Sequence, residues 1–157
     1  MNHIDSKRDA LLAALRRLDS CAVAFSGGVD SAVVAKAAAT ALVERAVAVT
    51  GRSASLAEGE LESAAELATL IGIRHVVVDT DELNKPDYLK NAPDRCYHCK
   101  TELYTQLERL LPELGVKAIV NGANADDLGD YRPGMGRIMP WEPERNTRSI
   151  YAPRCTI

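Results

Sequence analysis

A short apolar run that leads into a glycine pair constrains the fold of this chain more than any other feature. Residues 21–25 are apolar throughout, and Ser26, Gly27 and Gly28 follow them directly. Residues 29–42 then carry valine, alanine and leucine at helical spacing on one side. We therefore predict a buried strand, a tight turn and a helix in immediate succession. Glycines in such a turn let several backbone N–H groups, and the positive end of the helix, face an anion.

The unit of strand followed by helix recurs along the chain. Residues 46–50, 73–78 and 117–121 are predicted to form three more strands, and residues 61–71 and 103–114 have apolar side chains at helical spacing. Strands that alternate with helices pair in parallel through right-handed crossovers. The predicted fold class is α/β: a Rossmann-like parallel sheet with helices on both faces and with ligands at the carboxyl ends of the strands.

Composition and charge narrow the classes of partner. The chain has 157 residues, 46% of them hydrophobic, and a formal net charge of −3, as expected for one compact domain. This charge gives no general basic field, so we expect no nucleic-acid partner. No apolar run approaches the roughly 20 residues that span a bilayer, and Met1 leads into charged residues. We therefore expect no membrane association and a cytoplasmic location.

The residues best suited to bind phosphate are Ser26, Gly27, Gly28, Asp30 and Ser31. An apolar strand, the pattern S-G-G-x-D-S and a helix coincide there, which favours an anion-binding loop. The alternative is an ordinary strand-to-helix turn in which Asp30 or Ser31 caps the helix. The loop lacks the lysine of a Walker A motif, which argues against a P-loop ATPase.

Three segments resemble a known family. Residues 24–31, Ala-Phe-Ser-Gly-Gly-Val-Asp-Ser, look like the PP-loop of ATP pyrophosphatases, which have the adenine nucleotide alpha hydrolase fold and include NAD, GMP and asparagine synthetases and tRNA-thiolating enzymes. Those enzymes cleave ATP between the α- and β-phosphates and adenylate a substrate oxygen. Residues 94–100 and 121–134 are similar to the LarE family of ATP-dependent sacrificial sulfur transferases. The likeness covers about residues 11–134.

The resemblance implies an activity and a set of contacts. LarE enzymes activate a carboxylate of a pyridinium mononucleotide with ATP, release pyrophosphate and insert sulfur, in the synthesis of the nickel-pincer nucleotide cofactor. By position, the five loop residues would hold the pyrophosphate, and Thr50 and Ser53 would lie near adenosine. Ordinary turn chemistry is the alternative for these two residues. Arg52 departs from the family, whose members commonly have an acidic or amide residue at that position.

Two cysteines separated by two residues, Cys96 and Cys99, stand at the start of a predicted helix, where thiolates are favoured and two sulfurs can reach one metal. The resemblance implies that such a pair ligates an iron–sulfur cluster in one branch of the family. The alternatives are buried or redox-inert thiols, or a zinc site completed by His98 and a distant cysteine.

Polar residues after the fourth predicted strand are candidates for a second metal and for the substrate. Asn124, Asp126 and Asp127 could hold Mg²⁺, which an ATP-binding chain of this charge needs, or orient the nucleotide. Loop caps are the alternative interpretation of all three. Tyr131 and Arg132 could meet an anionic nucleotide carboxylate substrate, although an arginine in a loop is more often solvated.

The last part of the chain differs in composition from the rest. Residues 1–131 are predicted to form a PP-loop ATP-binding domain, and residues 132–157, with four of the seven prolines, an irregular tail without a core element. The tail does not resemble the family's continuation, and Cys155 lies in the wrong context to match a family cysteine. We therefore expect an incomplete form that lacks the family's second domain, with a divergent short form as the alternative. The missing domain would leave an apolar surface uncovered, which favours self-association or a homo-oligomer.

Three hypotheses of function follow. The first is an ATP-dependent sulfur transferase that adenylates a carboxylate. The second is an amide-forming synthetase of the NAD, GMP or asparagine synthetase type, which uses the same adenylation step. The third is a nucleotide-binding fragment without catalysis.

Overall fold

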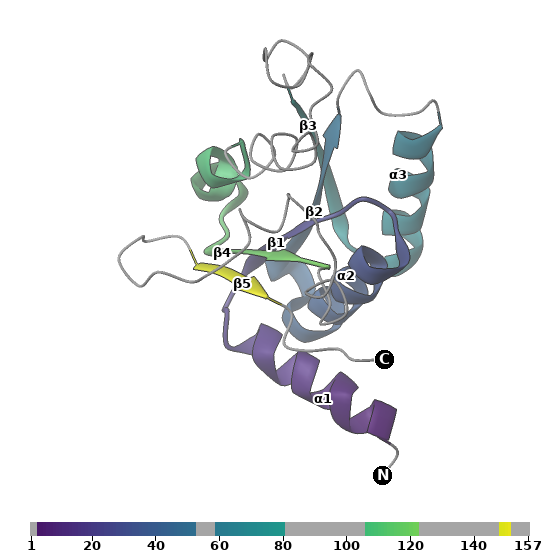
Figure 1. The fold of residues 1–157 in the computed structure, drawn as a ribbon. Helices are drawn as coiled ribbons and strands as arrows, with labels where there is room; N and C mark the ends of the chain where they lie inside the picture. Colours follow the sequence, from purple (N-terminus) through teal and green to yellow (C-terminus); the bar gives the residue numbers. More distant parts are fainter. Residues whose placement is uncertain (1–2, 53–58, 81–105, 123–147, 152–157) are drawn as a thin grey trace, which may run out of the picture.

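The chain folds around one parallel five-stranded sheet (Figure 1). The computed structural model describes residues 3–52, 59–80, 106–122 and 148–151. The strand order is β3-β2-β1-β4-β5, and every neighbouring pair is parallel. The predicted α/β class is therefore confirmed. The strands are β1 (Cys21–Ala24), β2 (Ala46–Arg52), β3 (Arg74–Asp79), β4 (Ala118–Asn121) and β5 (Arg148–Tyr151).

Helices cover both faces of the sheet. One face packs against α1, α2 and α3, and the helical residues 106–114 cover the other face with Leu107 and Leu111. The three helices on the first face are α1 (His3–Arg16), α2 (Val29–Leu42) and α3 (Glu60–Ile71), and a 3-10 turn, η1 (Val43–Arg45), leads from α2 into β2. The prediction of helices on both faces is confirmed.

Alternation along the strands explains how a nearly continuous apolar run serves two cores. In β1, Cys21 and Val23 belong to the core under α1–α3, and Ala22, between them, belongs to the core on the opposite face. β4 divides in the same way, with Val120 on the first face and Ile119 on the other. Successive side chains of a strand point to opposite faces, so a strand that is buried on both must be apolar at every position.

The expectation that residues 132–157 contain no regular element is wrong at residues 148–151. These residues form β5, which pairs in parallel with β4 at the edge of the sheet. The strand has only four residues, and it is joined to β4 by main-chain hydrogen bonds. Such bonds do not require apolar side chains at a regular spacing, so the sequence did not indicate the strand. The division of the chain at residues 131 and 132 stays a prediction.

The strand order fixes where a ligand can bind. From β1 the chain continues to β2 and β3 on one side, whereas β4 and β5 lie on the other side of β1. The strand order therefore reverses at β1, and in parallel sheets ligands bind beyond the carboxyl ends of the strands at such a point. No helix within the described ranges is both long and apolar enough to cross a membrane.

Candidate functional site

The glycine loop, residues 26–31, leads from the carboxyl end of β1 into α2 and lies beside Gly122, which follows β4. One hydroxyl, Ser31 Oγ, organises it. Ser31 Oγ donates a hydrogen bond to the Gly28 carbonyl oxygen at 3.0 Å and accepts one from the Ser26 N–H at 3.3 Å. Ser26 Oγ lies 3.2 Å from Ser31 Oγ and accepts a hydrogen bond from the Gly28 N–H at 3.2 Å. Because the Ser31 proton is directed to a carbonyl, the Ser26 hydroxyl is the donor between the two side chains.

Gly27 is required for the shape of this loop. Its φ of +81° lies in the left-handed region that L side chains rarely adopt. A β-carbon at this position would also approach Ala64 Cβ of α3 to 3.3 Å. The loop thus leads into α2 and lies against the first turns of α3.

The N-terminus of α2 directly follows the glycine loop. Among the described residues, no side chain caps this helix at Gly28, and the Gly28 carbonyl accepts the hydrogen bond of the Ala32 N–H at 2.9 Å. The first N–H groups of a helix have no acceptor within it and carry partial positive charge. Ser31 is buried and works inside the loop, whereas Asp30 is exposed at the helix start.

Gly122, immediately after β4, presses against this helix start. A β-carbon on Gly122 would lie 2.6 Å from Ser31 N and 2.8 Å from the carbonyl carbon of Asp30. Real β-carbons essentially never come this close to backbone, so any larger residue would displace the first turn of α2. The sequence prediction did not include Gly122 among the site residues. A glycine directly after an apolar strand was the available signal.

Thr50, which the sequence placed near adenosine, has two protein partners. Its Oγ1 donates to the Phe25 carbonyl oxygen at 2.7 Å and lies 2.8 Å from His75 Nε2. Thr50 is only 5% exposed. Burial lowers the pKa of His75 below its ordinary value of 6.5, so the ring is neutral at pH 7. A contact between Thr50 and adenosine stays a prediction, and His75 is a residue that the sequence prediction missed.

Arg52 and Asp79 form a two-pronged ion pair at the ends of β2 and β3. Arg52 Nε lies 2.6 Å from one carboxylate oxygen of Asp79, and Arg52 Nη2 lies 3.0 Å from the other. The hydrogen bond from Arg52 lowers the pKa of Asp79, and the same bond raises the pKa of Arg52. Both side chains are more than half exposed, so solvent weakens the pair. Asp79 thus places a carboxylate beside Arg52 at the carboxyl ends of β2 and β3.

Comparison with known proteins identifies the family. The sequence profile of the family described as Asparagine synthase matches residues 7–126, from α1 to just beyond β4. The chain belongs to this family. Its glycine loop is the PP-loop, as the sequence predicted.

Two relatives and one solved structure agree with this assignment. The chain is 33% identical, over 136 residues that cover 86% of it, to the pyridinium-3,5-bisthiocarboxylic acid mononucleotide synthase (LarE) of Lactiplantibacillus plantarum. It is 46% identical, over 84% of its length, to an uncharacterized protein of Synechocystis. The fold matches a glutamine-dependent NAD⁺ synthetase from Acinetobacter baumannii, solved with ADP, with a TM-score of 0.68 and 19% identity over 82% of this chain and 27% of that one. The resemblance to LarE is confirmed.

The chain spans 49% of the length of each of these two curated relatives. Several predicted site residues lie outside the described ranges, and their roles stay predictions. Among the described residues, no group of three or more histidine, cysteine, aspartate or glutamate side chains could hold a metal ion. The predicted residues outside the described ranges are Ser53, Cys96, His98, Cys99, Asn124, Asp126, Asp127, Tyr131, Arg132 and Cys155.

Cys21 is the cysteine that the described residues do contain. It is completely buried in β1, and this burial raises the pKa of its thiol to about 12. A thiol that stays protonated at neutral pH is a poor nucleophile and a poor metal ligand. Cys21 is therefore a core residue and not a carrier of sulfur.

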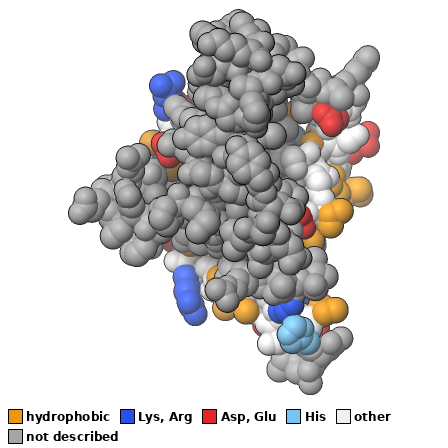
Figure 2. Space-filling model, in the orientation of Figure 1, with side chains coloured by type: hydrophobic (Ala, Val, Ile, Leu, Met, Phe, Trp, Pro, Cys, Tyr) orange, Lys and Arg blue, Asp and Glu red, His pale blue; other side chains and the backbone are white. Residues whose placement is uncertain are grey.

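Exposed apolar side chains gather on the side of the molecule where α2 and α3 lie (Figure 2). Val29 and Val33 on α2 are 76% and 44% exposed, and Leu70 on α3 is 82% exposed. The predicted self-association needs an apolar surface of this kind. Self-association itself stays a prediction.

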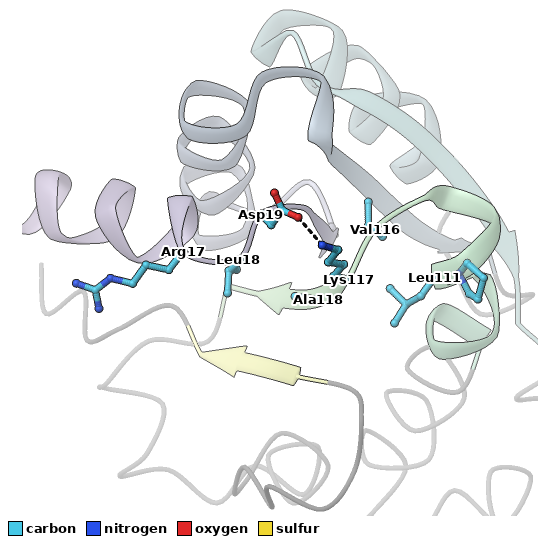
Figure 3. A pocket seen from close by; sticks show the side chains of 8 residues that line it. Arg17, Leu18, Asp19, Leu111, Val116, Lys117 and Ala118 are labelled. Carbon is cyan, nitrogen blue, oxygen red and sulfur yellow. Dashed lines mark hydrogen bonds and ion pairs between the residues drawn. The ribbon is translucent and has the colours of Figure 1, made fainter.

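A pocket lies at the amino ends of the strands, whereas the PP-loop lies at their carboxyl ends (Figure 3). It is bordered by Leu18 after α1, by Leu111 of the helical segment 106–114 and by Ala118 at the start of β4. Lys117 Nζ lies 2.6 Å from one oxygen of Asp19, and Arg45 Nη1 lies 2.8 Å from the other. Lys117 above all, and Arg45, hold the pKa of Asp19 below its ordinary value of 3.8. Lys117, one of the cations that line this pocket, is thus paired with Asp19, and the pocket lies at the amino ends of β1 and β4.

Proposed function

We propose that this chain is the nucleotide-binding part of an ATP-dependent enzyme that adenylates a substrate carboxylate and then transfers sulfur to it. The observation that carries the proposal is the PP-loop between the carboxyl end of β1 and the start of α2, held by the hydrogen bonds of Ser31 and by the close contact with Gly122. The 33% identity to a pyridinium-3,5-bisthiocarboxylic acid mononucleotide synthase supports the choice of a pyridinium mononucleotide carboxylate as substrate.

The proposed reaction has two steps. A carboxylate oxygen attacks the α-phosphorus of ATP, the bond between this phosphorus and the bridging oxygen to the β-phosphate breaks, and pyrophosphate leaves. A sulfur nucleophile then attacks the carbonyl carbon of the acyl adenylate, and AMP departs with the electron pair of the C–O bond. With sulfur at the sulfide level, neither step changes an oxidation state. Adenylation, the first step, needs only ATP and the acid.

The PP-loop residues fit the role of holding the departing pyrophosphate. Ser26, Gly27 and Gly28 present backbone without bulky side chains, and the α2 N-terminus adds partial positive charge. The hydroxyl network of Ser31 fixes the loop before any ligand binds. Donors that are already oriented stabilise developing negative charge without reorganisation during the reaction.

Asn124, Asp126 and Asp127 are the proposed ligands of Mg²⁺. Chain connectivity holds the Asn124 Cα within about 7 Å of the Gly122 Cα, and Gly122 packs against the start of α2. Oxygen ligands beside a bound triphosphate suit Mg²⁺. Thr50 and Ser53 are proposed near adenosine, and Tyr131 and Arg132 near the anionic substrate.

Cys96 and Cys99 are the thiolates proposed to ligate an iron–sulfur cluster, whose sulfide would supply the transferable sulfur. No step in adenylation depends on them. The first domain, residues 1–131, is proposed to bind the nucleotide, and the family's second domain to hold the other substrate.

The proposal is tested by ATP–pyrophosphate exchange, which needs only the adenylation step. The chain is incubated with Mg·ATP, labelled pyrophosphate and a pyridine carboxylate mononucleotide, with aspartate as the comparison acid. Label in ATP that depends on the mononucleotide supports the sulfur-transferase type. Exchange that depends on another acid, with amide formed from ammonia, supports the synthetase alternative.

Asp30→Ala is the companion variant, because its side chain sits at the exposed start of α2. An acidic side chain in the first turn of a helix contributes about 0.3–1 kcal/mol of stability, so affinity for Mg·ATP must be measured on protein shown to be folded by circular dichroism. We expect weaker binding and slower exchange. Binding of Mg·ATP without exchange with any acid would support the non-catalytic alternative, and unchanged affinity in folded Asp30→Ala would contradict the site assignment.

A further inference from the structure

We infer that His75 is a positioning residue for the PP-loop: acting through Thr50, it fixes the peptide group with which the loop begins. This inference rests on the proposed function, because it assigns a role in nucleotide binding to a residue outside the PP-loop. His75 lies on β3, two strands away from β1 in the sheet.

The hydrogen bonds around Thr50 have one consistent direction. The Thr50 hydroxyl has a single proton, and the Phe25 carbonyl oxygen, at 2.7 Å, can only accept it. The contact of 2.8 Å between Thr50 Oγ1 and His75 Nε2 must therefore be donated by the histidine. This assigns the neutral ring the tautomer with its proton on Nε2. His75 thereby orients the hydroxyl that holds Phe25.

Phe25 is held at three points. Its N–H donates to the Val49 carbonyl oxygen at 2.8 Å, and its carbonyl oxygen accepts the hydrogen bond of Thr50. Its ring packs edge-on against the His75 ring, with the centroids 5.9 Å apart and the planes at 79°. Phe25 is 2% exposed, so little solvent competes for these contacts.

This restraint reaches the PP-loop through one planar group. The Phe25 carbonyl and the Ser26 N–H belong to the same peptide, so the direction of one determines the direction of the other. The Ser26 N–H in turn donates to Ser31 Oγ at 3.3 Å. His75, Thr50, the Phe25–Ser26 peptide and Ser31 therefore form one continuous series of hydrogen bonds that ends inside the PP-loop.

The experiment compares His75→Leu, which removes the donor, with His75→Gln, whose amide nitrogen can still donate to Thr50. Thr50→Val and Thr50→Ser form the corresponding pair. Thr69→Val is the matched control, because Thr69 Oγ1 also bonds a carbonyl oxygen, that of Ala65, but within α3. For each protein we would measure the Kd for Mg·ATP, the Tm, and the amide NMR shift of Ser26 without ligand.

We expect His75→Leu and Thr50→Val each to weaken Mg·ATP binding by about tenfold, as the loss of one buried hydrogen bond predicts. The double variant should be no weaker than either single one, because both break the same series. His75→Gln and Thr50→Ser should retain the affinity and the Ser26 shift, and Thr69→Val should change neither.

An unchanged Ser26 shift in folded His75→Leu, or equal losses in His75→Leu and His75→Gln, would overturn the inference. Should His75→Leu fail to fold, His75→Gln and Thr50→Ser test the inference instead. Both variants keep a hydrogen-bond donor, so a changed Ser26 shift in both would contradict the inference. Absence of Mg·ATP binding in the unaltered chain would instead overturn the proposed function, and the Ser26 shift would still show whether His75 positions the peptide.

Discussion

The parallel sheet has a carboxyl edge, where its strands end, and an amino edge, where its strands begin. Both are polar, but they are built differently. At the carboxyl edge, hydrogen bonds between hydroxyl groups and backbone join Ser26, Gly28 and Ser31, and buried Thr50 bonds the carbonyl oxygen of Phe25 before them. At the amino edge, exposed side chains form ion pairs around Asp19. The network of the PP-loop fixes backbone N–H groups in space, whereas the ion pairs around Asp19 join long side chains that solvent can replace.

This difference predicts what substitutions do. Exposed ion pairs contribute little to stability, because water screens them and the side chains lose entropy when they pair. Hydrogen bonds to buried backbone are costly to break, because the partner is left unsatisfied. Substitutions at the carboxyl edge should therefore change ligand binding, and substitutions at the amino edge should change stability alone or nothing.

The largest effect is expected for Gly122→Ala at the carboxyl edge. The new β-carbon would lie 2.6 Å from Ser31 N, so the start of α2 must move, and the affinity for Mg·ATP should fall. We expect a loss of at least tenfold, which corresponds to about 1.4 kcal/mol. Isothermal titration calorimetry measures it.

Gly72→Ala is the control for this substitution. Gly72 ends α3 with φ of +79°, and a β-carbon there would meet nothing within 4 Å, so alanine causes backbone strain without a clash. It should cost about 1–2 kcal/mol of stability and leave the affinity unchanged. Equal affinities for Gly122→Ala and the unaltered chain would contradict the close contact.

Two buried serines, one at each edge, give the second test. Ser31 is 6% exposed and Ser20 is 5% exposed, and the Ser20 hydroxyl accepts a hydrogen bond from the Lys117 N–H at 3.1 Å. Either change to alanine should lower the free energy of unfolding by about 1–3 kcal/mol, because a backbone partner loses its bond. Only Ser31→Ala should also weaken Mg·ATP binding. Similar affinities in both variants would break the distinction between the edges.

A smaller effect is expected from pH. Burial lowers the pKa of His75 in the folded chain below the ordinary value of 6.5, which the unfolded chain retains. At a pH between the two pKa values the unfolded chain therefore binds more protons than the folded chain. The free energy of unfolding should therefore decrease as pH falls through 6.5 towards the lowered pKa. Urea titrations at a series of pH values measure this slope, and His75→Gln should reduce it. An identical slope in the two proteins would assign the effect to other groups.

The smallest effect is expected for Asp19→Asn. This change removes both ion pairs of the amino edge but retains a residue that tolerates the φ of 68° found there. The Tm at physiological salt and the affinity for Mg·ATP should both stay the same. A marked loss of either would show that the exposed pairs contribute more than solvent screening allows.

Most of the sheet could be predicted from the sequence, because residues 46–50, 73–78 and 117–121, like the run before the PP-loop, hold consecutive apolar residues and alternate with helical patterns. β5 could not, since residues 148–151 are joined to the sheet by pairing with β4 rather than by an apolar period. The PP-loop was predictable because its glycines and serines are adjacent in the chain.

Gly122 and His75 were not predicted for a different reason. Their contacts depend on which strands become neighbours: Gly122 meets α2 because β4 pairs with β1, and His75 meets Thr50 because β3 pairs with β2. A single sequence indicates the strands but not this order. The close contact of Gly122 and the hydrogen bond of His75 therefore required the structure.

The central claim is that the PP-loop, at the carboxyl edge, holds the phosphates of ATP. Titration of the ¹⁵N-labelled chain with pyrophosphate, and then with Mg·ATP, tests it most directly, because amide NMR shifts report which backbone N–H groups meet the anion. We predict shifts at residues 26–31 and at Gly122, with residues 17–20 and 116–118 unchanged. Shifts confined to the pocket beside Asp19 and Lys117, with the PP-loop amides unmoved at saturating ligand, would contradict it.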